Sequence, residues 1–144
     1  MTDTEIVTKS DFYDNVKDIL QRARDNAYRQ VNFNMVEAYW NIGKQIVEEE
    51  QSGKDRAEYG KYLIKELSSK LTSDFGKGFS QQNLRNMRQF YQLFPICSSL
   101  RSELAWTHYR LLLRIDNQVS REWYMNEAVA SNWSTRATDR LSLL

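Results

Sequence analysis

Residues 71–95, LTSDFGKGFSQQNLRNMRQFYQLFP, decide the fold, because they have the pattern of a helix, a tight turn and a second helix. Gly76 and Gly78 lie two positions apart, and glycine accepts the positive φ angles that a sharp reversal of the chain needs. We therefore expect the first helix to end at Phe75. The stretch predicts a helix-turn-helix unit, which we place within residues 54–95.

The second helix of this unit has two different faces. Ser80 can cap its first turn with a side-chain oxygen, and Pro95 ends it by removing a backbone donor. At about 100° per residue, one arc is apolar and is expected to face the core: Leu84, Met87, Phe90, Tyr91 and Phe94. The opposite side carries amides and guanidinium groups and no carboxylate: Gln81, Gln82, Arg85, Arg88, Gln89 and Gln92.

Amide and guanidinium groups can bond two atoms of a base edge or hold a phosphate. The second helix therefore has the character of a recognition helix that enters the major groove of DNA. The pattern alone fits an ordinary solvated face equally well. The surrounding charges favour the first interpretation.

Charge is distributed unevenly along a chain whose net charge is only +1. Residues 1–53 contain 6 basic and 10 acidic side chains, residues 54–92 contain 8 and 4, and residues 93–144 contain 6 and 5. The positive charge is concentrated around the proposed recognition helix, which favours a polyanion as partner. We expect backbone contacts to DNA from four lysines: Lys61, Lys65, Lys70 and Lys77.

The composition argues against three classes of protein: membrane-spanning, disulfide-rich and metal-binding. The chain has 144 residues, of which 41% are hydrophobic, and no apolar run approaches the length of about 18 residues that a membrane span needs. The N-terminus lacks the layout of a signal peptide, so we expect a cytoplasmic protein without a membrane partner. Cys97 and His108 are each the single residue of their type, which argues against a disulfide framework and a metal site.

The remaining chain is expected to be helical. Residues 1–9 are expected to form a disordered tail, and residues 10–52 a helical hairpin that breaks near Asn32–Asn34. Residues 104–144 should supply packing helices, with N-caps at Thr107 and Ser134, and Asp55 should cap the first helix of the central unit. A short two-stranded wing would fit near 96–106. The expected fold is mostly α, with a helix-turn-helix or winged-helix-like core in a single domain over 10–144.

Five runs of sequence carry a family resemblance: AYWNIGKQIVEEE at 38–50, AEYGKYLIKELS at 57–68, FGKGFSQQNLRNMRQFY at 75–91, LAWTHYRLLL at 104–113, and EWYMNEA at 122–128 with NWSTR at 132–136. In this order they resemble the N-terminal half of the YhcG-type bacterial proteins. The resemblance implies a helical, winged-helix-like DNA-binding module, followed in the parent protein by a nuclease domain of the PD-(D/E)XK type. The final run departs from the usual family pattern, because Ala137 and Thr138 follow Arg136.

The catalytic half of such a nuclease is not expected in this chain. Its pattern needs an aspartate and an acid-x-lysine pair that hold a divalent metal, and neither Asp-x-Lys nor Glu-x-Lys occurs in the sequence. Asp74 and Lys77 are one residue too far apart to form that pair. A phosphate-binding loop is also absent. We expect no catalytic residue, no metal and no cofactor in this chain.

The sequence leaves two hypotheses for the function of this chain. In the first, the chain is the DNA-binding, targeting module of a nuclease, and its partners are double-stranded DNA and the C-terminal nuclease domain. In the second, it is an interaction module: residues 10–52 form a homodimer or docking surface, and the basic face contacts an acidic protein or the nuclease domain. Salt should discriminate between them, because binding through several phosphates weakens steeply as salt rises.

Overall fold

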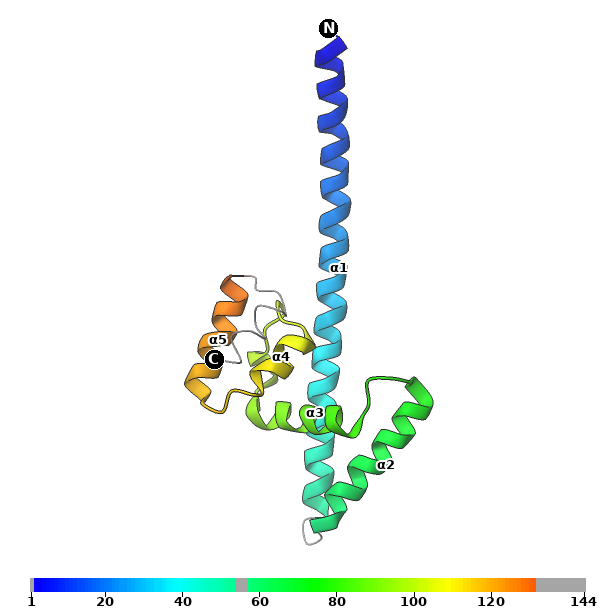
Figure 1. Ribbon diagram of the computed structural model, residues 1–144, viewed down its shortest axis with the longest axis vertical. Helices are drawn as coiled ribbons and strands as arrows, with labels where there is room; N and C mark the ends of the chain where they lie inside the picture. Colours follow the sequence, from blue (N-terminus) through cyan, green and yellow to red (C-terminus); the bar gives the residue numbers. More distant parts are fainter. Residues whose placement is uncertain (1, 54–56, 132–144) are drawn as a thin grey trace.

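The fold is a multi-helix assembly built on one very long helix (Figure 1). A computed structural model describes residues 2–53 and 57–131. Within them the elements are α1 Thr2–Ser52, α2 Ala57–Phe75, α3 Gln81–Leu93, the 3-10 turn η1 Cys97–Ser99, α4 Trp106–Leu112 and α5 Gln118–Ala130. These described residues contain no strand. The expectation of a mostly α, multi-helix domain is confirmed.

The N-terminal region is a single helix, and the expected hairpin over 10–52 is wrong. α1 has 51 residues and runs through Asn32 and Asn34 without a break. No glycine or proline lies between residues 10 and 42, and an asparagine costs a helix only about 0.7 kcal/mol relative to alanine. Gln30 Nε2 also donates to Asn34 Oδ1 at 3.0 Å across this turn. The backbone of residues 2–9, expected to be disordered, continues the same helix.

The helix-turn-helix punctuation is confirmed. α2 ends at Phe75, and the turn uses positive φ angles of 84° at Gly76 and 108° at Gly78. The Ser80 hydroxyl accepts from the backbone N–H of Asn83 at 3.1 Å, as an N-cap does. α3 then ends at Leu93, two residues before Pro95.

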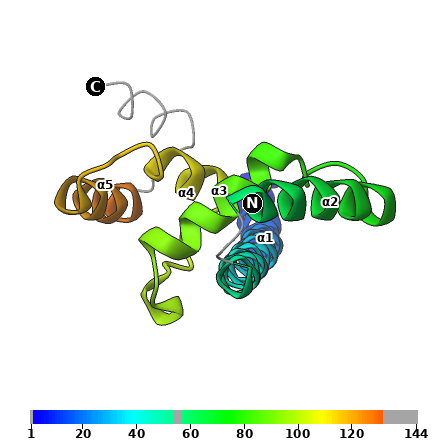
Figure 2. The ribbon, with the colours of Figure 1, turned by 90° about the horizontal axis from the view of Figure 1, so that it is seen from below.

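α3 is the central helix of the core. Its predicted inward arc is confirmed, since Leu84, Met87, Phe90 and Phe94 are buried and Tyr91 is partly buried. α3 crosses the lower part of α1 in Figure 1, with α2 on one side and α4 and α5 on the other. Figure 2, seen along α1, again shows α2 on one side of α3 and α4 and α5 on the other. The packing of α3 therefore links the two sides of the domain.

A close approach of two backbones makes this crossing possible. A Cβ atom at Gly43 of α1 would overlap the backbone carbonyl oxygen of Met87 on α3, and would lie 3.2 Å from the Cβ of Tyr91. Only glycine leaves room for that carbonyl. Gly43 therefore fixes where along α1 the second helix of the unit crosses.

The segment after α3 differs from the expected wing. Residues 96–106 contain the turn η1 and no strand, because their backbone hydrogen bonds are local: Ser99 N donates to Ile96 O at 3.0 Å, and Leu100 N donates to Cys97 O at 3.1 Å. α4 begins at Trp106 with Ala105 as its N-cap, so the cap expected at Thr107 is wrong by two residues. His108 Nδ1 accepts from the Ala105 backbone N–H at 3.1 Å, which is the bond that the third helical residue makes in a capping box, whereas alanine has no side-chain oxygen to make the reciprocal bond.

α5 closes the domain against α3 and α4. Asn117 caps it by accepting from Ser120 N at 3.0 Å. Arg121 is buried, donates to the Ile115 carbonyl at 2.7 Å and lies 5.7 Å from the centre of the Phe94 ring. The proposed caps at Asp55 and Ser134 and the expected last helix lie outside the described residues.

The first half of α1 stands apart from this body. It extends as a bare rod in Figure 1, and every described side chain from residue 10 to residue 32 is exposed. Within residues 2–53 and 57–131, no helix has both the length and the apolar character needed to cross a membrane.

Candidate nucleic-acid interface

The exposed face of α3 carries most of the predicted recognition side chains. Five of the six positions are exposed: Gln81, Gln82, Arg85, Gln89 and Gln92. Arg85 Nη2 lies 3.5 Å from Gln82 Oε1, and Gln82 Nε2 donates to Asn86 Oδ1 at 3.1 Å. These weak or surface bonds can be exchanged for bonds to a ligand. The first two turns of α3 therefore present amide and guanidinium groups to solvent.

The sixth position, Arg88, has a different environment. Its Nη1 donates to the two carboxylate oxygens of Glu50 on α1 at 3.0 and 3.2 Å. Both side chains are about three-quarters buried, with exposed fractions of 28% and 26%. Arg88 follows the residue at which α3 crosses α1, so its side chain meets α1 and not open solvent. The carboxylate missing from the α3 sequence is supplied here by another helix.

Gln89 is also partly engaged. Its Nε2 donates to the Leu113 carbonyl at 3.3 Å, next to the end of α4. Gln92 is exposed near the C-terminus of α3, whereas Gln81, Gln82 and Arg85 are exposed near its N-terminus. In helix-turn-helix proteins this is the end of the recognition helix that reaches base edges.

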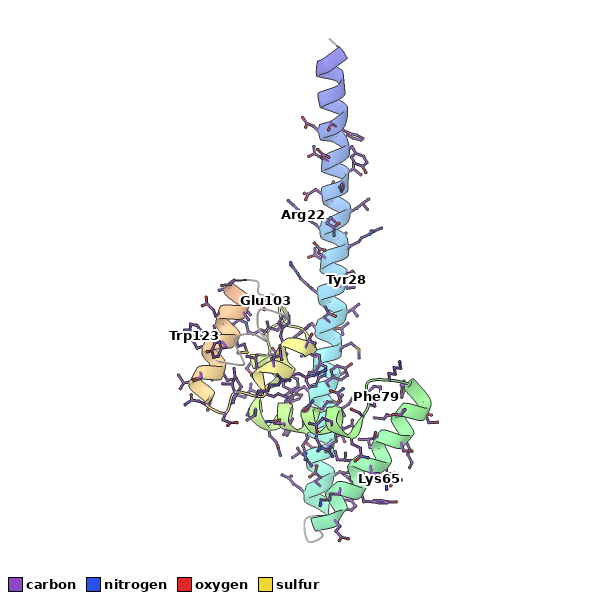
Figure 3. All side chains as sticks on the ribbon, in the orientation of Figure 1. Arg22, Tyr28, Lys65, Phe79, Glu103 and Trp123 are labelled. Atoms are coloured by element: carbon purple, nitrogen blue, oxygen red, sulfur yellow. The ribbon has the colours of Figure 1, made fainter. Side chains whose placement is uncertain are left out.

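The four lysines lie on α2 and the turn. Lys61, Lys65 and Lys77 are exposed, and Lys65 is marked on α2 in Figure 3. Lys77 lies in the glycine turn that leads into α3. Lys70 forms an exposed ion pair with Glu66 at 2.8 Å. The hydrogen bond from Lys70 lowers the pKa of the Glu66 carboxyl and raises that of the ammonium group.

The α3 face is held rigidly from behind. Trp40 Nε1 of α1 donates to the Phe94 carbonyl at 2.6 Å, and Trp106 Nε1 of α4 donates to Asn83 Oδ1 at 3.2 Å. The Phe90 ring packs between Trp106 and Tyr109, with ring centres 5.3 and 4.8 Å apart. A helix fixed in this way can present side chains in one geometry, as recognition of a duplex requires.

Two residues of this site were not predicted from the sequence. Asn83 connects the glycine turn to α4, because its Nδ2 donates to Gly78 O at 2.5 Å while its Oδ1 accepts from Trp106. Glu50 binds Arg88 across a separation of 38 residues. Asn83 lies three residues after the cap residue Ser80, and a polar side chain at that position commonly bonds back to the start of the helix, so its role could have been predicted. No local pattern pointed to Glu50.

A second feature of the surface is an apolar pocket of about 440 Å³ between α1 and α2. It is lined mainly by Ile42, Ile46, Leu63, Leu67 and Leu71. Across the residues that the structure describes, no three histidine, cysteine or acidic side chains come together as a metal site would require. The pocket therefore offers a mainly apolar surface, with the carboxylate of Glu49 at its lining.

Comparisons with known proteins agree with the resemblance found in the sequence. Residues 15–141 match the family described as DUF1016 N-terminal domain. Over 82 residues, the chain is 45% identical to a protein of Escherichia coli (strain K12) named putative nuclease YhcG. That alignment spans 57% of this chain and 22% of the relative's length. No solved structure matches the chain.

Proposed function

Because the chain belongs to the DUF1016 N-terminal domain family, we propose that it is the DNA-binding, targeting module of a nuclease. The printed name of the Escherichia coli relative, a putative nuclease, supports the link to nucleic acid. The partners under this proposal are double-stranded DNA and a C-terminal nuclease domain of the PD-(D/E)XK type, in the bacterial cytoplasm. The cutting step belongs to that domain, and this chain is non-catalytic.

The observation that carries the proposal is the exposed, carboxylate-free face at the start of α3. Gln81, Gln82 and Arg85 lie there side by side on a helix whose opposite face is mostly buried. Lys77 adds a cation in the adjoining turn. Bidentate donors on a rigid helix, next to a cation, are the combination that base edges and phosphates bind.

The proposal assigns separate roles to these residues. Under the proposal, Gln81, Gln82 and Arg85 enter the groove, and Gln89 assists from the next turn. Arg88 sets the position of α3 through Glu50, and contacts DNA only by leaving that carboxylate. Lys61, Lys65 and Lys77 hold phosphates. Lys70 does so only by competing with its bond to Glu66.

The test is a titration of fluorescent duplex DNA at low and moderate salt. Arg85→Ala should weaken binding by about 5- to 150-fold, corresponding to the ~1–3 kcal/mol of one base-edge contact. Lys77→Gln should weaken binding on every sequence and reduce the salt slope by about 1. The matched control is Arg22→Ala, which removes an exposed arginine from the bare half of α1.

The proposal predicts binding that weakens as salt rises, is weakened by Arg85→Ala and is unaffected by the control. Absence of binding at low salt would contradict it. Equal effects of Arg85→Ala and Arg22→Ala would also contradict it, because they would show attraction to charge without an α3 interface.

A second candidate function is an interaction module, and a separate observation favours it. The bare half of α1 exposes large apolar side chains, among them Phe12, Ile19 and Leu20. Monomeric proteins rarely expose a long contiguous apolar surface, and such surfaces mark interfaces. DNA binding through α3 and association through α1 use different parts of the molecule, so one chain can do both.

A further inference from the structure

An apolar row follows one side of the bare half of α1. It consists of Phe12, Val16, Ile19, Leu20, Ala23, Ala27 and Val31. Phe12 is 70% exposed and Ile19 65%, although both would be buried in an ordinary amphipathic helix. At about 100° per residue, the seven side chains fall within an arc of roughly 120°, which is the width of a helix-packing face. The row therefore has the form of an interface without a partner.

The domain's own body does not cover this row. Gly43, where α3 crosses, points about 180° away from the middle of the row at the same ~100° per residue. The body in Figure 1 accordingly lies beside the lower part of α1, while the upper part, with Arg22 labelled in Figure 3, carries no other element. A second molecule can therefore approach the row without displacing α3.

The charges around the row indicate which molecule fits. Residues 10–18 carry three aspartates and one lysine, and residues 21–29 carry three arginines and one aspartate. The two ends of the row thus have net charges of −2 and +2. A second copy running in the opposite direction places each acidic end beside a basic end. A parallel copy places like charges together, which costs stability and selects against that orientation.

The sizes of the side chains point to the same partner. When two copies run antiparallel with their midpoint between Ile19 and Leu20, Phe12 faces Ala27 and Val16 faces Ala23. Each large side chain then meets a small one, so that the layers can interdigitate. Parallel pairing would instead place Phe12 on Phe12 and Ala27 on Ala27.

We propose that the bare half of α1 pairs with a second copy of this chain as an antiparallel two-helix coiled coil, centred between Ile19 and Leu20. The inference deepens the interaction-module candidate and is independent of DNA binding. The two α3 faces remain open, on the outer sides of the pair. Their crossing points lie roughly 70 Å apart along the dimer axis, at ~1.5 Å per residue from the centre to Gly43.

Sedimentation equilibrium without DNA tests whether the pair forms. The 144-residue chain should be in concentration-dependent equilibrium with a dimer, and Ile19→Asp with Leu20→Asp should make it monomeric at every concentration tested. Both positions are exposed, so in dilute solution, where the wild type is also monomeric, the variant should keep the circular dichroism spectrum of the wild type. The control Asn32→Asp adds a carboxylate outside both charged ends and about 160° from the middle of the row, at ~100° per residue, and should leave the dimer intact. A monomeric wild type overturns the dimer, and a dimer that survives the double substitution overturns its location on α1.

Cysteine cross-linking then tests the orientation. In a Cys97→Ser background, Phe12→Cys and Ala27→Cys are made as separate variants and oxidised alone and as a mixture. The antiparallel pair predicts a disulfide between positions 12 and 27 in the mixture, and little linkage within either variant alone. Self-linkage of Ala27→Cys as strong as that in the mixture would show parallel pairing and overturn the orientation while leaving association intact.

Discussion

The two halves of α1 belong to one uninterrupted helix, yet they have opposite environments. In the half after residue 35, Val36, Trp40 and Ile46 are 0%, 6% and 2% exposed, because α3 and its neighbours cover them. In the first half, Phe12 is 70% exposed and Leu20 57%. The exposed fractions differ because α3 and its neighbours cover the second half, whereas no described element covers the first half. The helix itself is the same in both halves. Helical periodicity shows that a face needs covering, but it does not show which molecule supplies the cover.

The largest contrast between the halves should appear when one phenylalanine is truncated in each environment. Phe90→Ala removes a fully buried ring from the centre of the core, and should lower the free energy of unfolding by about 3–5 kcal/mol. Phe12→Ala should change the stability of the dilute chain by less than about 0.5 kcal/mol. Urea denaturation at low protein concentration measures both. A large loss with Phe12→Ala would mean that the first half is covered within the same chain.

The next effect concerns the crossing of α1 and α3. Gly43→Ala drives a methyl group into the Met87 carbonyl, and should destabilise the domain by about 3 kcal/mol despite alanine's better helix propensity. Gly60→Ala is the matched control, since its nearest neighbour is the flexible carboxylate end of Glu50 at 3.2 Å. The denaturation midpoints should separate the two variants clearly. Equal midpoints would indicate that α3 does not approach α1 at Gly43.

A smaller effect should depend on pH. Burial raises the pKa of Tyr109 from 10.0 to about 12, so the folded state keeps this proton after the unfolded state has lost it. Stability from Tyr109 is thus fully present below pH ~10 and falls as the pH rises toward about 12, by about 2–3 kcal/mol. The Tyr109→Phe chain should lack this part of the alkaline loss.

Tyr28 in the bare half supplies the control for that experiment. It is 71% exposed, and Tyr28→Phe should leave the alkaline unfolding profile unchanged. Chemical denaturation at a series of pH values between 8 and about 12 measures all three proteins. Identical profiles for wild type and Tyr109→Phe would contradict the burial of the phenol in the folded core.

The smallest effect compares two ion pairs with the same distance. Arg88–Glu50 and Arg22–Asp18 both measure 3.0 Å, but the exposed fractions are 28% and 26% in the first pair and 78% and 55% in the second. Double-mutant cycles should give a coupling of about 1 kcal/mol for the pair that joins α3 to α1, and about 0.3–0.5 kcal/mol for the pair on bare helix. Equal couplings would mean that partial burial at the crossing has no energetic consequence.

The sequence predicted local structure well where backbone chemistry decides it. The glycines at 76 and 78, the cap at Ser80 and the apolar arc of α3 all lie as expected. The site was predicted less completely, because Arg88 was placed on the open face by its position on the helix alone. Its partner Glu50 is 38 residues away, and only the crossing of α1 and α3 brings the two together.

The errors share a physical cause. Two asparagines near residue 33 suggested a break, but a helix ends where backbone groups find better partners, and nothing here competes for them. A two-stranded wing was expected to fit near 96–106, yet this segment satisfies its backbone within local turns.

Hydrogen–deuterium exchange along α1, measured at two protein concentrations, tests most directly whether one half is a buried scaffold and the other half an interface for a second chain. We predict that amides in residues 36–50 exchange slowly at both concentrations, because the core of this domain protects them. Amides in residues 10–31 should exchange rapidly in dilute solution, where a bare helix frays, and more slowly at high concentration, where a second chain covers it. Slow exchange in residues 10–31 that does not change on dilution would contradict the division of α1 into a buried scaffold and an open interface.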